Sequence, residues 1–205
     1  MEKYDNNVEF HPFKPFLPEG ARLLMLGTFP PARHRWSMEF YYPNFQNDMW
    51  RIVGHCFFGD KLHFVANDGK HYRLEELKTF LAEKGIALYD ACTSIVRTKN
   101  TASDKDLLVV RQTDIPAMLT TLPHCRAVVT AGQLATTLCC QQFGVSEPKV
   151  GDFVEINPQP SMFNVQPSMS NVQSSMFNVQ SSIFNVQPSM VNVQPSMFNV
   201  QSSMF

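Results

Sequence analysis

The hydrophobic pattern of residues 22–143 alternates between short apolar runs and helical spacing. Three runs are apolar throughout, at about residues 22–29, 86–88 and 127–130. Wholly apolar runs of this length are typical of strands buried on both faces of a parallel sheet. Apolar residues recur at helical spacing in four stretches, at about residues 46–58, 74–84, 113–122 and 133–143. This order predicts an α/β fold, a three-layer α/β/α arrangement with a short, mostly parallel central sheet.

The loops that follow the apolar runs are candidate ligand-binding segments, because ligands of parallel sheets bind at the carboxyl ends of the strands. These loops come after Gly27, Leu88 and Thr130. The first is the richest in functional groups, with a Pro-Pro pair, two arginines, a histidine, a tryptophan and two tyrosines between residues 30 and 45. The polar stretches 59–72 and 94–106 are predicted to be loops.

Charge and cysteine content exclude several classes of protein. The formal net charge of -1 gives no electrostatic case for nucleic acid over the whole surface, so such a contact would need a local patch. The five cysteines form no C-x-x-C pair, which argues against a metal site and predicts reduced thiols in a cytoplasmic protein. The sequence contains no G-x-G-x-x-G or Walker loop. We therefore expect neither a cofactor nor a metal.

Composition divides the chain into three parts. Residues 1–21 are predicted to form an extended Pro/aromatic arm, packed on the domain by Phe13 and Phe16. Residues 22–156 carry the α/β pattern and are predicted to be one domain, and the protein is predicted to be a monomer. The polar, acidic N-terminus is unlike a signal peptide, and no apolar run approaches the roughly 20 residues that span a bilayer. No membrane association is expected.

Residues 157–205 are seven consecutive seven-residue repeats without any Lys, Arg, Asp or Glu. Proline in four of the copies argues against a coiled coil, because an interior proline costs a helix about 3 kcal/mol. The Asn, Gln, Ser, Phe and Met content favours a disordered tail that is prone to β-type self-association. A regular stack of the short units is the alternative.

Three segments between about residues 10 and 150 resemble the uracil-DNA glycosylase superfamily, most closely its mismatch-specific and hypoxanthine-type branches. LLMLGTFPP and FYYPNFQNDMW resemble the family's first strand, G-x-x-P turn and following Asn/Trp segment. GIALYDACTSIVRTKNTASDKDL resembles the second-strand segment, and AVVTAGQLA resembles the third strand and its glycine turn. The resemblance implies a DNA glycosylase of base excision repair, which extrudes a deaminated base, uracil or hypoxanthine, from DNA and hydrolyses its N-glycosidic bond.

The resemblance implies that Asn47 is catalytic and holds the attacking water. Phe29 occupies the third position of the G-x-x-P turn, where many relatives place a water-handling Asp or Asn, and a phenyl ring cannot fill that role. The hypoxanthine-type branch uses an Asn in the following segment, and Asn47 matches it, three residues before Trp50. The alternative is that Asn47 caps the helix predicted to begin there, since Asn is favoured at helix starts.

The base pocket that the resemblance implies contains five residues: Gly27, Thr28, Phe29, Tyr42 and Asp90. Tyr42 would stack on the extruded base, and Phe29 would line the pocket. Asp90 ends the second predicted strand, where it would accept a hydrogen bond from the edge of the base. The alternatives are a core or rim aromatic for Tyr42 and a capping or turn residue for Asp90.

Six residues are candidates for contact with the DNA backbone: Arg33, Arg35, Arg97, Lys99, Ser103 and Gly132. Arg33, His34 and Arg35 form a compact basic patch, which suits phosphate contact at the mouth of a crevice. A solvated loop is the alternative. Gly132 is expected to make a tight turn that lets a phosphate or base approach closely.

The sequence departs from the family's pattern after residue 150. Relatives continue with a fourth strand, a Pro/Ser-rich loop and a last helix that helps expel the base. Here a fourth strand would begin at Phe153–Ile156, and the repeats follow. The loss would leave apolar surface exposed and weaken base extrusion, so impaired activity is expected. A non-catalytic DNA-binding remnant is the alternative function, and a small-molecule α/β enzyme is a third hypothesis.

Overall fold

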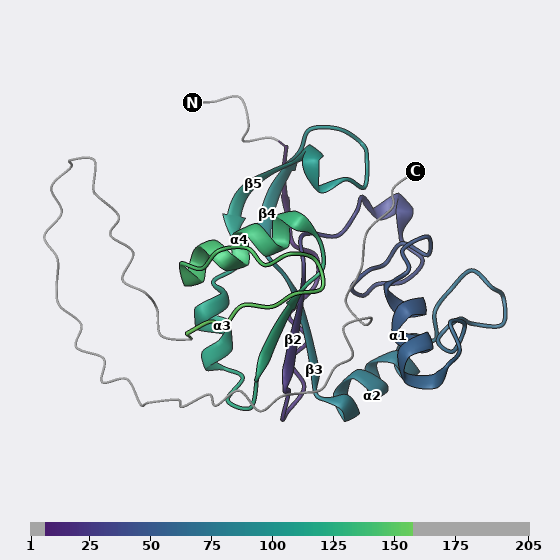
Figure 1. Cartoon of the computed structure of the whole chain (residues 1–205). Coiled ribbons are helices and arrows are strands. Elements are labelled where there is room, and N and C mark those ends of the chain that lie inside the picture. Colours follow the sequence, from purple (N-terminus) through teal and green to yellow (C-terminus); the bar gives the residue numbers. More distant parts are fainter. Residues whose placement is uncertain (1–6, 158–205) are drawn as a thin grey trace, which may run out of the picture.

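The computed structural model describes residues 7–157, which form a mixed α/β fold with two small sheets (Figure 1). The parallel sheet has the strand order β3-β2-β6 and consists of β2 (Leu23–Gly27), β3 (Ile86–Asp90) and β6 (Ala127–Thr130). The antiparallel sheet has the order β1-β4-β5 and consists of β1 (Val8–Phe10), β4 (Cys92–Arg97) and β5 (Leu107–Gln112). The predictions for the repeat tail concern residues that lie outside the described range.

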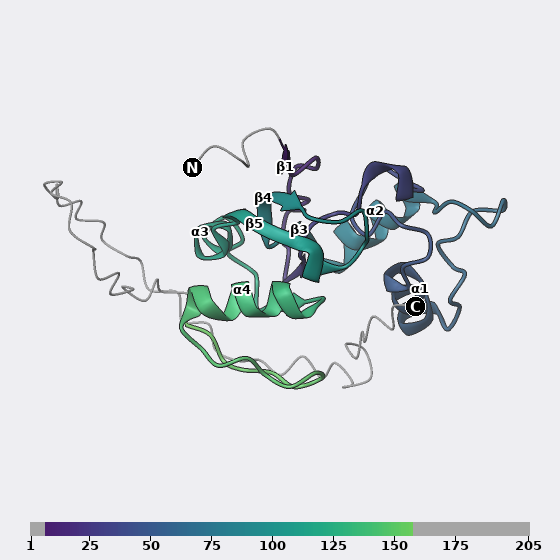
Figure 2. The same cartoon turned by 90° about the horizontal axis from the view of Figure 1, so that it is seen from above.

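Helices cover both faces of the parallel sheet, as Figures 1 and 2 show. One face carries α1 (Met49–Phe58) and α2 (Leu74–Lys84), and the other carries α3 (Ile115–Thr120) and α4 (Gln133–Phe143). The central strands are wholly apolar because both of their faces are buried; Leu24, Leu26 and Leu88 are each 0% exposed. The predicted three-layer α/β/α class is confirmed.

Local sequence explains where the helices begin and end. The side chain of Asp114 accepts from Ala117 N at the start of α3, and Pro116 occupies the first turn, where its missing N–H has no cost. Gly85 ends α2 in the left-handed conformation at φ 67, as predicted, and the chain enters β3 directly.

The strand β4 lies in a stretch that was predicted to be a loop, and that prediction is wrong for residues 94–97. The chain leaves β3 through Ala91 and continues into β4, whose partners are β1 and β5. Ile95 and Val96 favour a strand, but their small and polar neighbours leave too short an apolar run for the sequence pattern to predict one. The strand forms because β5 pairs with it on one side and β1, more than 80 residues earlier in the sequence, pairs with it on the other, and local propensity cannot reveal the second contact.

The N-terminal arm is part of the fold. The strand β1 pairs antiparallel with β4, and Phe16 exchanges backbone hydrogen bonds with Leu88 at 3.0 and 2.8 Å. Phe13 and Phe16 pack against the main core, so the predicted anchoring of the arm is confirmed.

The chain after α4 does not add the expected fourth strand. Residues 153–156 form no strand, and the side chain of Phe153 is 83% exposed. The prediction of a strand at Phe153–Ile156 is therefore wrong. A turn at Lys149–Asp152, with Gly151 at φ 82, redirects the chain just before these residues. Within residues 7–157, β6 consequently has one strand partner, β2.

None of the helices in residues 7–157 has the length and apolar character needed to cross a membrane. In the same range, no group of three or more His, Cys, Asp or Glu residues is arranged to hold a metal ion.

Candidate functional site

Polar side chains gather at the carboxyl ends of the three parallel strands. We call this group the strand-end cluster, and it consists of His11, Gly27, Thr28, Tyr42, Asp90, Asp104 and Gly132. Thr28 and Asp90 are 5% and 6% exposed, so most of the group is shielded from solvent. The structure thus brings together the ends of β2, β3 and β6, the edge at which ligands of parallel sheets bind.

Asp90 is held by a histidine from the N-terminal arm. Parallel pairing places Asp90 directly opposite Gly27. The ring nitrogen Nε2 of His11 is hydrogen-bonded to Asp90 Oδ2 at 2.9 Å, while His11 Nδ1 contacts the backbone of Phe13. The side chains of His11 and Asp90 are only 2% and 9% exposed. A buried acid thus has a buried hydrogen-bond partner, which buried charge requires.

Gly27 leaves room for the two polar groups beside it. A Cβ at this position would lie 2.4 Å from Asp90 Oδ1 and 3.4 Å from the Tyr42 hydroxyl oxygen. Real Cβ atoms do not tolerate the first distance, so any larger residue would push the Asp90 carboxyl away. The absence of a side chain at Gly27 is what allows the acid and the phenol to converge on the end of β2.

The Tyr42 hydroxyl is buried and has no hydrogen-bond partner among residues 7–157. Burial, and next the carboxyl of Asp90, raises the pKa of Tyr42 well above its ordinary value, so the hydroxyl stays a proton donor. The ring packs edge-on against Trp50 with centroids 5.7 Å apart. Tyr42 also has φ 49, an uncommon backbone conformation for a residue other than glycine. Such a conformation persists only where its surroundings impose it.

Asp104 is a cluster residue to which the sequence analysis gave no role. It begins the short 3-10 helix η3 (Asp104–Asp106), and its Oδ2 accepts from Thr28 Oγ1 at 2.6 Å. Burial raises the pKa of the Asp104 carboxyl, and the carboxyl of Asp90 adds to this effect. The sequence feature that could have identified Asp104 was the Ser103-Asp104 pair near the end of the segment GIALYDACTSIVRTKNTASDKDL.

Gly132 closes the cluster on the side of β6. A Cβ there would lie 3.2 Å from Asp104 Oδ2, and the backbone has φ 111, which favours glycine. A close approach at Gly132 was expected, and in the structure the group that approaches is the Asp104 carboxyl.

His11 received no role from the sequence either, and no local signal marks it. It reaches Asp90 only because the arm pairs with β4, a contact that joins residues 79 positions apart. Phe29 contacts this histidine edge-on with ring centroids 5.3 Å apart and is partly exposed.

A thiol nucleophile is excluded at this edge of the sheet. Burial, followed by the nearby carboxyls of Asp90 and Asp104, raises the pKa of the Cys92 thiol to about 12. The thiol is therefore neutral near pH 7, and only a thiolate would act as a nucleophile.

Asn47 lies outside the strand-end cluster. Its Oδ1 accepts from Met49 N at 2.8 Å, so its side chain is engaged at the start of α1, one residue before the N-cap Asp48, and the residue is exposed. Tyr72 donates to the Asn47 backbone oxygen at 3.3 Å. Within the described part of the chain, no hydrogen bond connects Asn47 to a member of the cluster.

Most of the predicted DNA-backbone residues are engaged with other protein groups. Arg97 donates to Glu9 Oε1 and Oε2, each at 3.0 Å, and to Pro30 O, also at 3.0 Å. Arg33 pairs with Glu39, and Lys99 Nζ lies 3.5 Å from Asp106 Oδ1. The Ser103 hydroxyl accepts from Lys105 N at the start of η3. Arg97 therefore joins β1, β4 and the first loop, and its guanidinium is already occupied.

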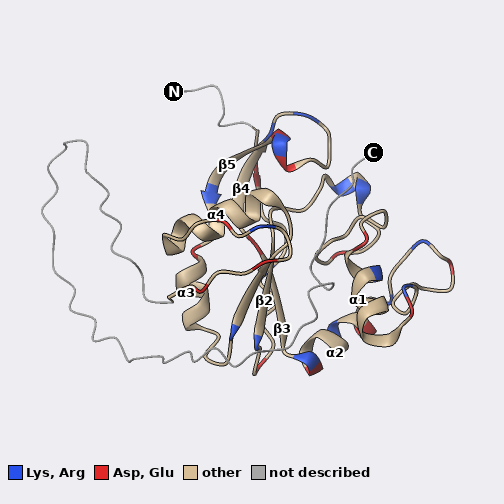
Figure 3. Ribbon diagram, viewed as in Figure 1, with Lys and Arg blue, Asp and Glu red and all other residues tan. Residues whose placement is uncertain are grey.

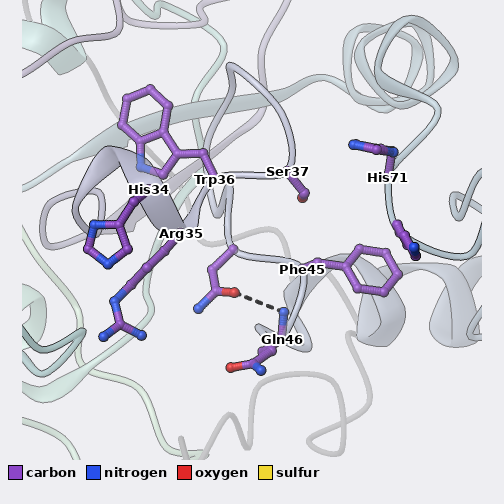
Figure 4. Close-up of a pocket in the computed structure, with 9 residues that line it drawn as sticks. His34, Arg35, Trp36, Ser37, Phe45, Gln46 and His71 are labelled. Carbon is purple, nitrogen blue, oxygen red and sulfur yellow. Dashed lines mark hydrogen bonds between the residues drawn. The ribbon is translucent and has the colours of Figure 1, made fainter.

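A second feature is a cavity of about 390 Å³ beside α1, which we call the basic cavity (Figure 4). The residues that line it include His34, Arg35, Trp36, Phe45, Lys70 and His71. Figure 4 shows His34 and Arg35 on one side and Phe45 and His71 on the other. Figure 3 shows Lys and Arg spread along the chain, and two of them, Arg35 and Lys70, line this cavity.

No protein-family model matches the sequence, and no curated protein matches it significantly. Among solved structures, the fold is similar to the solution NMR structure of a proposed uracil DNA glycosylase from Methanosarcina acetivorans. The two chains share 24% sequence identity at a TM-score of 0.50, over 67% of this chain and 80% of that chain. At this identity the likeness concerns the fold alone, and it shows that the two chains share a mixed α/β fold.

Proposed function

We propose that the chain is a DNA glycosylase-like protein that hydrolyses the N-glycosidic bond of a deaminated base, uracil or hypoxanthine, in DNA. The observation that carries the proposal is the strand-end cluster. It places two carboxyl groups and a buried, unpaired tyrosine hydroxyl at the ligand-binding edge of the sheet. A buried donor without a partner is costly, and a polar ligand would satisfy it.

The reaction needs a group that takes a proton from water and a group that stabilises the departing base. Asp104 is our candidate for the first role, because a carboxylate of raised pKa is a stronger base. The water oxygen bonds to C1′ of the sugar while the C1′–N bond breaks and its electron pair leaves with the base. The water proton passes to Asp104. The base, held by a hydrogen bond from the Tyr42 hydroxyl, then takes up a proton from solvent.

Asn47 is the second candidate for the water-holding group. Its side-chain oxygen is engaged with Met49 N, whereas Asp104 lies within the cluster, so the contacts favour Asp104. Replacing each residue separately distinguishes the two. Asp104→Asn should abolish cleavage, and Asn47→Ala should retain it. Cleavage that is retained in Asp104→Asn and lost in Asn47→Ala would instead assign the water-holding role to Asn47.

We further propose that activity is weaker than that of intact glycosylases. Residues 153–156 do not pair with β6, and Phe153 is exposed, which fits the loss of the last family motif. The same observation favours the second candidate function, a non-catalytic protein that binds DNA without cleaving it.

Duplex DNA containing uracil or hypoxanthine, treated with alkali after incubation, tests the proposal. Strand scission that is slow and is lost in Asp104→Asn and Tyr42→Phe would support it. Tyr42→Phe keeps the ring and removes the hydroxyl alone. Salt-dependent binding without scission would instead support the non-catalytic alternative. Scission at the rate of intact enzymes would contradict the expected impairment.

A further inference from the structure

The basic cavity carries groups that the proposed base-excision chemistry does not use. The ammonium group of Lys70 is exposed and makes no ion pair within residues 7–157. The Arg35 guanidinium donates from Nη2 to Asn100 O at 3.3 Å, and its Nε is buried without a partner in the described part of the chain. Two cationic side chains thus border a cavity of about 390 Å³ with donor capacity unused.

An aromatic ring stands among these cations. Phe45 borders the cavity, and its ring is held by the Arg51 guanidinium, 4.5 Å from its centroid, and by Tyr72, whose ring centroid is 5.1 Å away. Trp36 is also fixed, because its Nε1 donates to Pro31 O at 2.7 Å. A planar ring held rigidly offers a stacking surface at little entropic cost.

The carboxyl group of Asp68 lies beside the cavity but does not pair with Arg35 or Lys70. Asp68 bonds to His71, and the hydrogen bond from that side chain lowers the pKa of Asp68 to about 2. Asp68 is therefore ionised near pH 7, and its Oδ2 is engaged by the His71 ring. Arg35, on the opposite side, and Lys70 have no such acidic partner among the described residues, so they are the cations left for an anion.

We propose that the basic cavity binds one nucleotide of single-stranded or locally opened DNA, with the base against Phe45 and its two flanking phosphates at Arg35 and at Lys70, on opposite sides of the cavity. A cavity of this size lies in the range that holds such a ligand. Cations that follow the backbone together with an aromatic that accepts any base are the usual means of binding single strands. The inference rests on the proposed function, because it takes DNA as the partner.

The cavity is connected to the strand-end cluster through one loop. Arg35 contacts Asn100, and the same loop continues to Asp104, which bonds to Thr28. In the proposed complex, a strand whose extruded base enters the cluster places a neighbouring nucleotide in the cavity. The subsite would hold the opened strand while adding no contact to the reacting bond.

Binding of a fluorescently labelled, undamaged single-stranded oligonucleotide, followed by anisotropy at several salt concentrations, tests the inference. Arg35→Gln and Lys70→Gln should each weaken binding about fivefold or more and lower the salt slope by about 0.7. Phe45→Leu should weaken binding by a similar factor without changing the slope. Lys61→Gln is the matched control, since Lys61 is exposed, lies outside the cavity and should change binding less than twofold.

Three outcomes would overturn the inference: no binding by the unaltered protein, an equal loss in Lys61→Gln, or normal binding by Phe45→Leu. A free mononucleotide that competes as strongly as the oligonucleotide would also overturn it, because the site would then serve a small molecule. The oligonucleotide contains no base to excise. Failure of this test and failure of the glycosylase assay are therefore separate results.

Discussion

The strand-end cluster and the basic cavity use polar side chains in opposite ways. In the cluster, carboxyl groups are shielded from solvent and bonded to other side chains, as in the His11–Asp90 and Thr28–Asp104 contacts. In the cavity, cations stand at an open space, and Lys70 makes no ion pair among the described residues. The side chains of the cluster are therefore part of the packed interior, whereas the cations of the cavity lie at the surface.

Because of this difference, substitutions in the two regions should change the stability of the fold by different amounts. Changing a shielded group leaves its partner unsatisfied in a poorly solvated place, so the fold loses free energy. Changing an exposed cation costs almost nothing, because water replaces its contacts. The cluster is suited to chemistry, which needs fixed groups and perturbed acids. The cavity is suited to binding, which needs accessible charge.

The largest expected effect is that of His11→Ala. The change leaves the Asp90 carboxyl buried without its partner and opens a gap beside Phe29, so unfolding free energy should fall by about 3 kcal/mol. Urea unfolding followed by tryptophan fluorescence measures it. The matched change in the cavity is His71→Ala, which also breaks a His–Asp pair, but one with side chains 58% and 49% exposed. It should cost less than about 1 kcal/mol, and equal losses would refute the contrast.

Gly27→Ala should come second, with a loss of about 2 kcal/mol from overpacking. The added methyl meets Asp90 Oδ1 at 2.4 Å, and Asp90 cannot turn aside without breaking its bond to His11. Near the cavity, Gly69→Ala meets no atom within 4 Å and should cost about 1 kcal/mol, from its left-handed backbone at φ 63 alone. Combining Gly27→Ala with Asp90→Ala should be less than additive. Full additivity would show that the two groups do not collide.

Much of the fold could be predicted from the sequence because the parallel strands are apolar on both faces and the helices carry clear end signals. The runs around Leu24, Leu88 and Val128 became β2, β3 and β6 in the expected parallel arrangement. The strand β4 was missed because its stability comes from pairing with β1, more than 80 residues away in the sequence.

The candidate site was predictable in part, for a similar reason. Gly27, Thr28 and Asp90 lie at the ends of strands that periodicity could identify, so their convergence followed from the topology. Asp104 and His11 reach the site from a loop and from the arm, and no local pattern encodes those approaches. Asn47 illustrates the opposite case, because its role was inferred from resemblance while its local contact is that of a helix start.

Asp104→Asn should act in the opposite direction and stabilise the fold at neutral pH. A carboxyl whose folded pKa is raised contributes stability that is present below its ordinary pKa and is lost as pH rises through the folded value. The amide keeps an acceptor for Thr28 and removes the buried charge. The midpoint of thermal unfolding should rise by about 2–4 °C at pH 8, corresponding to roughly 1 kcal/mol, and the gain should vanish toward pH 4.

Asp106→Asn is the control for that change, two residues along the same loop. The hydrogen bond from Thr101 lowers the pKa of Asp106, so this carboxyl contributes stability above its ordinary pKa and loses it in acid. Its replacement should therefore destabilise the protein at neutral pH and have no effect at low pH. Two variants with the same sign at pH 8 would contradict the distinct environments of the two acids.

The smallest expected effect on stability is that of Lys70→Gln in the basic cavity. The side chain is exposed and makes no ion pair within residues 7–157, so unfolding free energy should change by less than about 0.5 kcal/mol. The same variant is expected to lose affinity for single-stranded DNA, which separates binding from folding at this position. Parallel urea titrations and anisotropy measurements on one preparation compare the two quantities. A loss of stability as large as that of His11→Ala would place Lys70 in the framework of the fold and remove the distinction between the two regions.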